Sequence, residues 1–162
     1  MRPALVSFVV ALAVWPQQLK DNRWAALSFL IGEWSGEGVG GPGQGSGGFS
    51  FLPDQDRKVL IRRNRADYPA TKDKPAYSHT DLMIVYKEET SLRAIYFDNE
   101  DHVINYDVVA SPSSVQFLNK TYRLTYSQTG PDLVSIRFEI SPPDHPGDFK
   151  TYIDARAHRK SR

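Results

Sequence analysis

The sequence contains no cysteine, so disulfide bridges, thiolate metal sites and a cysteine nucleophile are all excluded. An excess of one charge is also missing, because 20 Lys and Arg residues stand against 19 Asp and Glu residues. This balance argues against nucleic acid or an anionic membrane as a partner. With 162 residues, of which 40% are hydrophobic, the chain has the length and composition of one globular domain.

Several catalytic and nucleotide-binding signatures are missing too. The chain has no G-x-S-x-G elbow, no phosphate-binding glycine loop and no H-x-x-x-H pair. No apolar run reaches the roughly 20 residues that a membrane-spanning helix needs. The sequence therefore predicts no metal, no cofactor and no membrane partner beyond an export signal.

That signal is predicted at the N-terminus. Arg2 supplies a positive charge, residues 4–14 carry none, and Ala11-Leu12-Ala13 matches an A-x-A cleavage site. This pattern is typical of a signal peptide, which we place within residues 1–18. It predicts a secreted or periplasmic protein with a single domain over residues 19–162. The alternative is that the apolar run is an N-terminal core strand or helix.

Only one segment has a clear helical pattern. In residues 20–31, Trp24, Leu27 and Ile31 recur at helical spacing, and Gly32 follows as a stop signal. A helix this short is expected to pack against something larger.

Glycine is concentrated in one stretch, since nine of the eleven glycines lie between residues 32 and 48. The stretch predicts a strand over residues 33–39 followed by a flexible connection. Gly36 and Gly38 would share one face of that strand, at positions where the backbone approaches a neighbour too closely for a Cβ.

The rest of the chain alternates short extended runs with turn residues. The predicted strands cover residues 48–52, 58–66, 78–87, 92–97, 103–110, 114–118, 122–127, 133–140 and 149–159. Their connections are short, so consecutive strands should pair antiparallel. Together with the earlier strand, this predicts an all-β, up-and-down antiparallel barrel of about ten strands, with a short N-terminal helix capping one end.

The segment Gly32-Glu33-Trp34-Ser35-Gly36-Glu37-Gly38 resembles the opening of lipocalin-like (calycin) barrels. It is closest to the G-x-W-x-G-x-G opening of nitrobindin-type barrels and is also similar to uncharacterised secreted bacterial barrels. The resemblance implies a ten-stranded barrel with an internal ligand cavity, in which Trp34 closes one end.

Nitrobindin-type barrels bind haem through a histidine early in the final strand. Here Tyr152 stands near the place where that histidine would fall. Because tyrosine can ligate haem iron, the resemblance leaves haem binding open as an alternative to a protein without a cofactor.

The run over residues 57–65 is strongly basic. Alternation places Arg63 and Arg65 on one face and Arg62 on the other, so either face would bring an arginine to a cavity. Such a guanidinium could bind a carboxylate or phosphate. The alternative is a solvated strand end.

His79 and Asp81 lie two residues apart and share one face of the next predicted strand. Side by side, they could form an acid–base pair or hold a metal ion with help from residues elsewhere. The alternative is a polar stripe that faces solvent, because the opposite face of this strand is apolar.

Each reversal of the chain brings the end of one strand beside the start of the next. We therefore predict a ligand site at one opening of the barrel, with the connection over residues 68–76 as a gating loop and an acidic ligand group as its target. Its predicted residues are Arg63, Arg65, His79, Asp81, Tyr96, His102 and Tyr106.

The leading hypothesis for function is a secreted barrel that holds an amphipathic or anionic small molecule without turnover. The second is a barrel enzyme in which His79 and Asp81 act as the acid–base pair while Arg63 or Arg65 stabilises an anion. The third is a structural or partner-binding domain with a solid interior. The oligomeric state stays open.

Overall fold

The computed structural model describes residues 23–161. The predicted signal peptide, residues 1–18, lies outside these described residues. Within them, no helix is both long enough and apolar enough to cross a membrane.

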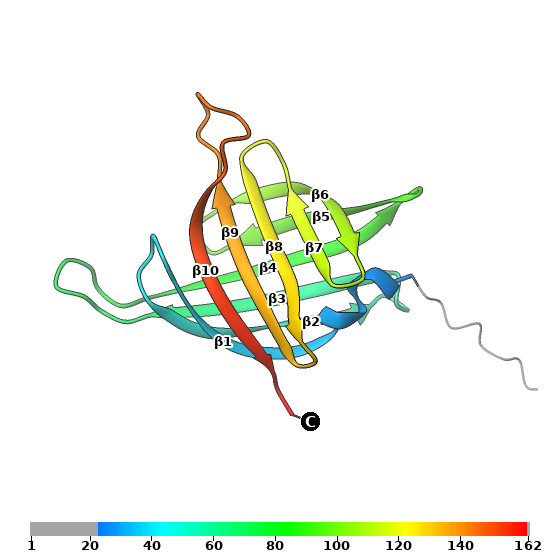
Figure 1. The fold of residues 1–162 in the computed structure, drawn as a ribbon, viewed down its shortest axis with the longest axis horizontal. Helices are drawn as coiled ribbons and strands as arrows, with labels where there is room; N and C mark the ends of the chain where they lie inside the picture. The colour runs from blue at the N-terminus through cyan, green and yellow to red at the C-terminus, as the bar shows by residue number, and fades with distance from the viewer. Residues whose placement is uncertain (1–22, 162) are drawn as a thin grey trace, which may run out of the picture.

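Ten antiparallel strands form one closed barrel, in which each strand pairs with its neighbours in sequence and β1 closes the sheet on β10 (Figure 1). The strands are β1 (Gly32–Gly40), β2 (Gly45–Asp54), β3 (Val59–Tyr68), β4 (Tyr77–Glu88), β5 (Ser91–Asp98), β6 (Val103–Ser111), β7 (Ser114–Leu118), β8 (Tyr122–Gly130), β9 (Leu133–Ile140) and β10 (Lys150–Arg159). The predicted fold class is confirmed. A closed barrel has no free edge strand to pair with another chain.

Two local predictions need correction. The helix over residues 20–31 is a shorter 3-10 helix within the described residues, η1 (Ala25–Leu30), which ends before Gly32 at a φ of +133°. The predicted flexible connection is also shorter, because Gly45, Gly47 and Gly48 belong to β2 and pair with β1.

The up-and-down order places alternate connections at opposite ends of the barrel. The β1–β2, β3–β4, β5–β6, β7–β8 and β9–β10 connections lie at one end, which we call the mouth. Helix η1 lies at the other end, where Trp24 Nε1 donates a hydrogen bond to the Arg57 carbonyl in the β2–β3 connection (2.9 Å).

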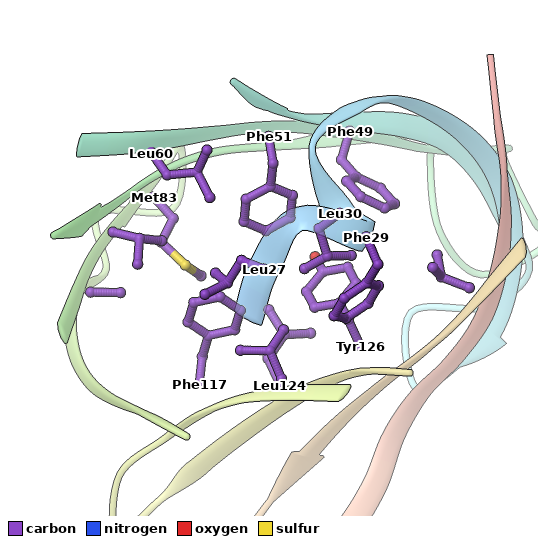
Figure 2. Packing of buried hydrophobic residues seen from close by; sticks show 14 of the residues in the cluster. Leu27, Phe29, Leu30, Phe49, Phe51, Leu60, Met83, Phe117, Leu124 and Tyr126 are labelled. Atoms are coloured by element: carbon purple, nitrogen blue, oxygen red, sulfur yellow. The ribbon is translucent and has the colours of Figure 1, made fainter. Parts of the chain in front are cut away.

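The hydrophobic core fills the helix end of the barrel. Leu27 and Leu30 of η1 are fully buried among inward-facing residues from the strands (Figure 2). An aromatic cluster forms the centre of this core, and its members are Phe49, Phe51, Phe117 and Tyr126. The helix thus plugs one end, and the apolar packing stops partway along the barrel.

Trp34 links the plug to the sheet. Its ring is 1% exposed, stacks on Phe49 at 5.8 Å and donates a hydrogen bond from Nε1 to the Leu30 carbonyl (2.9 Å). Arg159 of the last strand covers the ring with its guanidinium at 4.3 Å and donates hydrogen bonds to the Phe29 and Ile31 carbonyls. The first and last strands are therefore tied to the helix by one residue pair.

Gly36 and Gly38 of β1 lie very close to the neighbouring strand β10. A Cβ at Gly36 would collide with the Arg156 carbonyl and lie 2.8 Å from Ala157 Cα, and one at Gly38 would lie 2.5 Å from Ala155 Cβ. The absence of a side chain lets the two strands close the barrel at this seam.

Candidate functional site

A cavity of about 510 Å³ opens at the mouth and reaches down to the top of the core. Its deepest side chains form a ring around the barrel, and on every strand of the ring except β10 the next inward residue belongs to the core or packs against it. The ring consists of Phe49, Arg62, Asp81, Tyr96, Tyr106, Leu124, Ile136 and Ala157. The interior is therefore half packed and half open.

The cavity has one apolar side. Strands β8, β9 and β10 contribute Tyr122, Leu124, Ile136, Phe138, Ile140 and Ile153. Tyr122 stacks on Phe138 at 5.8 Å, and Phe138 meets Tyr152 edge to face at 6.2 Å. This side can cover the hydrocarbon or aromatic part of a ligand.

Glycines of β1 and β2 form a second side, and tyrosine rings pack against their hairpin. A Cβ at Gly45 would lie 2.5 Å from the ring of Tyr68, and one at Gly41 would collide with the ring of Tyr152. Tyr68 also stacks on Tyr77 at 4.7 Å. The hairpin is thereby held between rings from the strands on either side of it.

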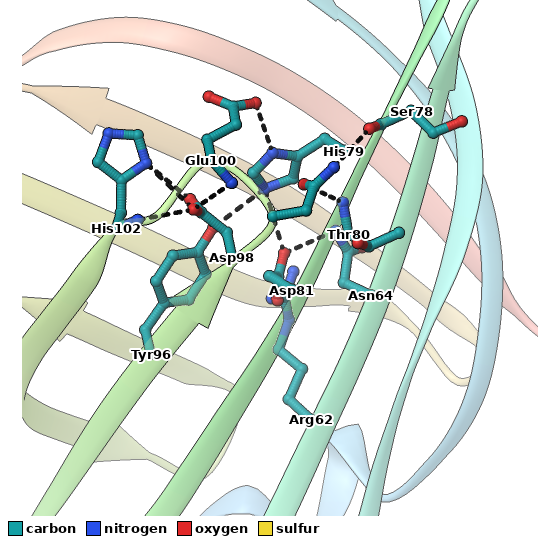
Figure 3. A network of polar contacts seen from close by, with 11 residues as sticks. Arg62, Asn64, Ser78, His79, Thr80, Asp81, Tyr96, Asp98, Glu100 and His102 are labelled. Carbon is teal, nitrogen blue, oxygen red and sulfur yellow. Dashed lines mark hydrogen bonds and ion pairs between the residues drawn. The ribbon is translucent and has the colours of Figure 1, made fainter.

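The third side is polar and is built by β3, β4, β5 and the start of β6 (Figure 3). At its deep end, Arg62 Nη1 donates a hydrogen bond to Asp81 Oδ1, and the two side chains are only 7% and 3% exposed. Asn64 Nδ2 donates a second bond to Asp81 Oδ2 at 2.8 Å. Burial is the largest single influence and disfavours the charged guanidinium, but the Asp81 carboxylate together with Tyr126 and Tyr96 outweighs it and raises the pKa of Arg62 above its ordinary value.

Above this pair, His79 bridges two strands. Its Nδ1 lies 3.0 Å from Glu100 Oε1, and its Nε2 lies 3.0 Å from the Tyr96 hydroxyl and 3.5 Å from Asp81 Oδ2 (Figure 3). The contact with Asp81 is the largest cause that raises the pKa of His79, and Glu100 adds to it against the effect of burial. The protonated ring satisfies all these acceptors, because both of its nitrogens then donate.

Asp98 completes the polar side at the β5–β6 connection. Its Oδ1 accepts hydrogen bonds from the backbone N–H groups of Glu100 and His102, and its Oδ2 accepts them from Tyr96 (3.2 Å) and His102 Nδ1 (2.9 Å). Burial opposes its charge, but these donors hold the pKa of Asp98 below its ordinary value.

The structure gathers most of the predicted site residues. His79, Asp81, Tyr96, His102 and Tyr106 all line the cavity, although they belong to three strands and a connection. The apolar face of β4, with Leu82 and Ile84, points outward instead. Whether these residues bind a ligand stays a prediction.

The prediction for the arginines needs correction. Arg63 is exposed and does not line the cavity, because Leu60 of the same strand is buried in the core and alternation then turns Arg62 inward and Arg63 outward. Arg65 borders the cavity, but its side chain is 62% exposed and pairs with Asp67. The anion-stabilising arginines that the enzyme hypothesis assumed therefore do not face His79.

Several polar residues of the cavity were not among the predicted site residues, and those of the polar cluster are Arg62, Asn64, Asp98 and Glu100. Arg62 and Asn64 follow from the alternation once the buried face of β3 is known. Asp98 is the last residue of β5, and Glu100 lies in the turn that follows. The Asp-Asn-Glu-Asp sequence of residues 98–101 predicts only a reversal of the chain, not a binding site.

Haem binding, which the resemblance leaves open through Tyr152, stays a prediction. On β10 the cavity is lined by Tyr152, Ile153, Ala155, Arg156 and Ala157, and of these only the Tyr152 hydroxyl could ligate iron. Tyr152 packs its ring against Gly41 at a β-bulge, and His158 is exposed. Within residues 23–161, no group of three or more His, Asp or Glu side chains could hold a metal ion.

Comparisons with known proteins concern the fold. No protein family matches the chain, and no curated protein shows detectable similarity to it. Among solved structures, it is similar to a de novo designed fluorescence-activating β-barrel at 12% sequence identity and a TM-score of 0.45. The match covers 84% of this chain and 98% of the designed barrel.

Proposed function

We propose that this protein is a calycin-like barrel that binds one small amphipathic molecule in its cavity without chemical turnover. The observation that carries the proposal is the cavity itself, whose volume of about 510 Å³ falls within the range of ligand pockets, roughly 300–1,000 Å³. Its apolar side on β8–β10 and its polar side on β3–β6 offer separate surfaces for the two parts of such a molecule.

The contacts of His79 favour binding over catalysis. A general base needs a nitrogen that is free to take a proton from the substrate. In His79, one ring nitrogen faces Glu100 and the other faces Tyr96, each at 3.0 Å. The polar cluster is therefore more suited to a fixed hydrogen-bonding surface than to proton transfer.

Filling the cavity tests the proposal. Ile104 lines the cavity, whereas its neighbour Val103 is 61% exposed on the outer wall. The probe is phenylnaphthylamine, a neutral dye whose fluorescence rises in apolar surroundings. We expect the wild type and Val103→Trp to bind one dye molecule per chain, and Ile104→Trp to lose at least tenfold in affinity.

Circular dichroism of each variant checks that the barrel is intact. The proposal fails if the folded wild type does not bind the dye, or if Ile104→Trp binds it as tightly as Val103→Trp does. If the proposal holds, native mass spectrometry of protein from its own source would identify the natural ligand by its mass.

A further inference from the structure

Arg62 has far more hydrogen-bond donors than it uses. A guanidinium carries five N–H groups, yet Asp81 accepts the one hydrogen bond that Arg62 makes among the described residues. Its Nε is fully buried and has no partner within residues 23–161. Since buried donors are almost always paired in folded proteins, this one points to a partner that is not part of the described chain.

Two tyrosine hydroxyls near Arg62 also lack a hydrogen-bond partner among the described residues, and that of Tyr126 is fully buried. Tyr126 is fully buried beneath the cavity, and its hydroxyl has no hydrogen-bond partner among the described residues; it lies close to the guanidinium, but not in hydrogen-bond geometry. Tyr106 lines the deep ring, and residues 23–161 offer its hydroxyl no hydrogen bond either. Burial raises the pKa of both tyrosines, so both hydroxyls stay neutral and able to donate.

The carboxylates at this depth are, in contrast, already engaged. Asp81 accepts from Arg62 on one oxygen and from Asn64 on the other, with His79 also within 3.5 Å. Both oxygens of Asp98 accept hydrogen bonds as well. The deep polar side therefore has donors without any partner, whereas each carboxylate oxygen there already accepts a hydrogen bond.

We infer that the ligand enters head first and that its polar end carries an accepting oxygen, a carboxylate or a carbonyl, which takes hydrogen bonds from Arg62 and Tyr106 at the bottom of the cavity. Its apolar part then lies along Phe138, Ile140 and Tyr122 toward the mouth. This inference rests on the proposed function. It replaces the rim arginines of the sequence prediction with a single buried one.

The charge of the head group is a separate matter from its hydrogen-bonding character. Asp81 already balances the charge of Arg62, so a neutral carbonyl and a carboxylate present the same accepting oxygen to the same donors. An alkylammonium head only donates, so it would compete with Arg62 and Asn64 for the oxygens of Asp81 and leave the unused donors without a partner.

Three octyl amphiphiles separate these cases by displacement of bound phenylnaphthylamine: octanoate, methyl octanoate and octylamine. We expect octanoate and methyl octanoate both to bind at least tenfold more tightly than octylamine. The ratio between the first two shows whether the natural head group is charged. Octylamine binding as tightly as either of them would overturn the inference.

Conservative variants locate the head group. Tyr106→Phe removes one hydroxyl, and we expect it to weaken octanoate binding roughly three- to tenfold, as for the loss of one hydrogen bond. Arg62→Lys keeps the charge beside Asp81 but removes Nε–H and the planar fork, and we expect a loss of roughly tenfold or more. The matched control is Tyr86→Phe, which removes a hydroxyl on the outer face of β4, outside the cavity, and should leave octanoate binding unchanged.

The dye separates the two proposals. If the wild type does not bind the dye, the proposed function fails. If all variants bind the dye, but Tyr106→Phe and Arg62→Lys bind octanoate as the wild type does, the cavity is a binding site and the head-first orientation is wrong. A loss of octanoate binding in Tyr122→Phe, at the predicted tail, without a loss in Tyr106→Phe would likewise place the head at the mouth.

Discussion

Removing the Asp81 carboxylate should be among the most damaging single changes in this barrel. Asp81→Asn keeps the size of the side chain but leaves the charge of Arg62 without its counterion, and both side chains are more than 90% buried. Breaking a buried ion pair on one side costs about 3–5 kcal/mol, because the remaining charge stays desolvated. We expect a loss of that size in the free energy of unfolding.

The double variant Arg62→Met/Asp81→Leu should behave quite differently. Replacing both charges by apolar groups is often neutral or stabilising by about 1–4 kcal/mol. Against this gain, Asn64 and His79 lose an acceptor, which costs about 1–3 kcal/mol. The two effects nearly cancel, so we expect the double variant to lie within about 2 kcal/mol of the wild type and to bind no octanoate.

Urea denaturation of the wild type, Asp81→Asn, the single variants Arg62→Met and Asp81→Leu, and the double variant measures these differences and the coupling between the two sites. The reasoning is refuted if Asp81→Asn loses less than about 1 kcal/mol, because the pair would then behave as a solvated one. It is refuted equally if the costs of the two single variants simply add in the double variant. A stable double variant without ligand binding would show that the pair is retained for the site.

Three further predictions concern the plug, the seam and the histidine. Trp34→Ala should lose about 3–5 kcal/mol in urea denaturation, as for a large core aromatic, and a change within about 0.5 kcal/mol would contradict the role of Trp34 in the plug. Gly36→Val should cost about 3 kcal/mol or more, because the new side chain would meet backbone at Ala157; an unchanged thermal midpoint would contradict the close approach. The pKa of His79 is raised, chiefly through Asp81, so its protonated form stabilises the fold below its ordinary pKa of 6.5, and this contribution is lost as the pH rises through the higher folded value. The stability gap between wild type and His79→Gln should therefore shrink as the pH rises above 6.5, and a gap that widens would refute the assignment.

The number and direction of the strands could be predicted from local signals alone. Turn residues such as Ser111-Pro112-Ser113 interrupt the extended runs at short intervals, and short connections permit only antiparallel neighbours. Ten strands in sequential order then leave a barrel as the arrangement without free edges. The pairing of His79 with Asp81 on one face is equally local, since it depends only on the two-residue period of a strand.

Which face turned inward was decided by the tertiary structure. Both faces of β3 begin apolar and become basic, so alternation alone could not distinguish Arg62 from Arg63. Arg62 faces inward because Leu60, on the same face of β3, packs in the core beside residues from distant strands. Those packing contacts exist only once the barrel has closed.

The open half of the barrel is also a property of the assembled fold. Helix η1 and the aromatic cluster fill one end, whereas the glycines of β1 and β2 leave the other end without side chains to fill it. The local sequence determined the strands, their order and the face that His79 shares with Asp81. The cavity and the inward orientation of Arg62 depend on how the side chains of all ten strands pack together inside the barrel. No single segment of the sequence specifies that packing.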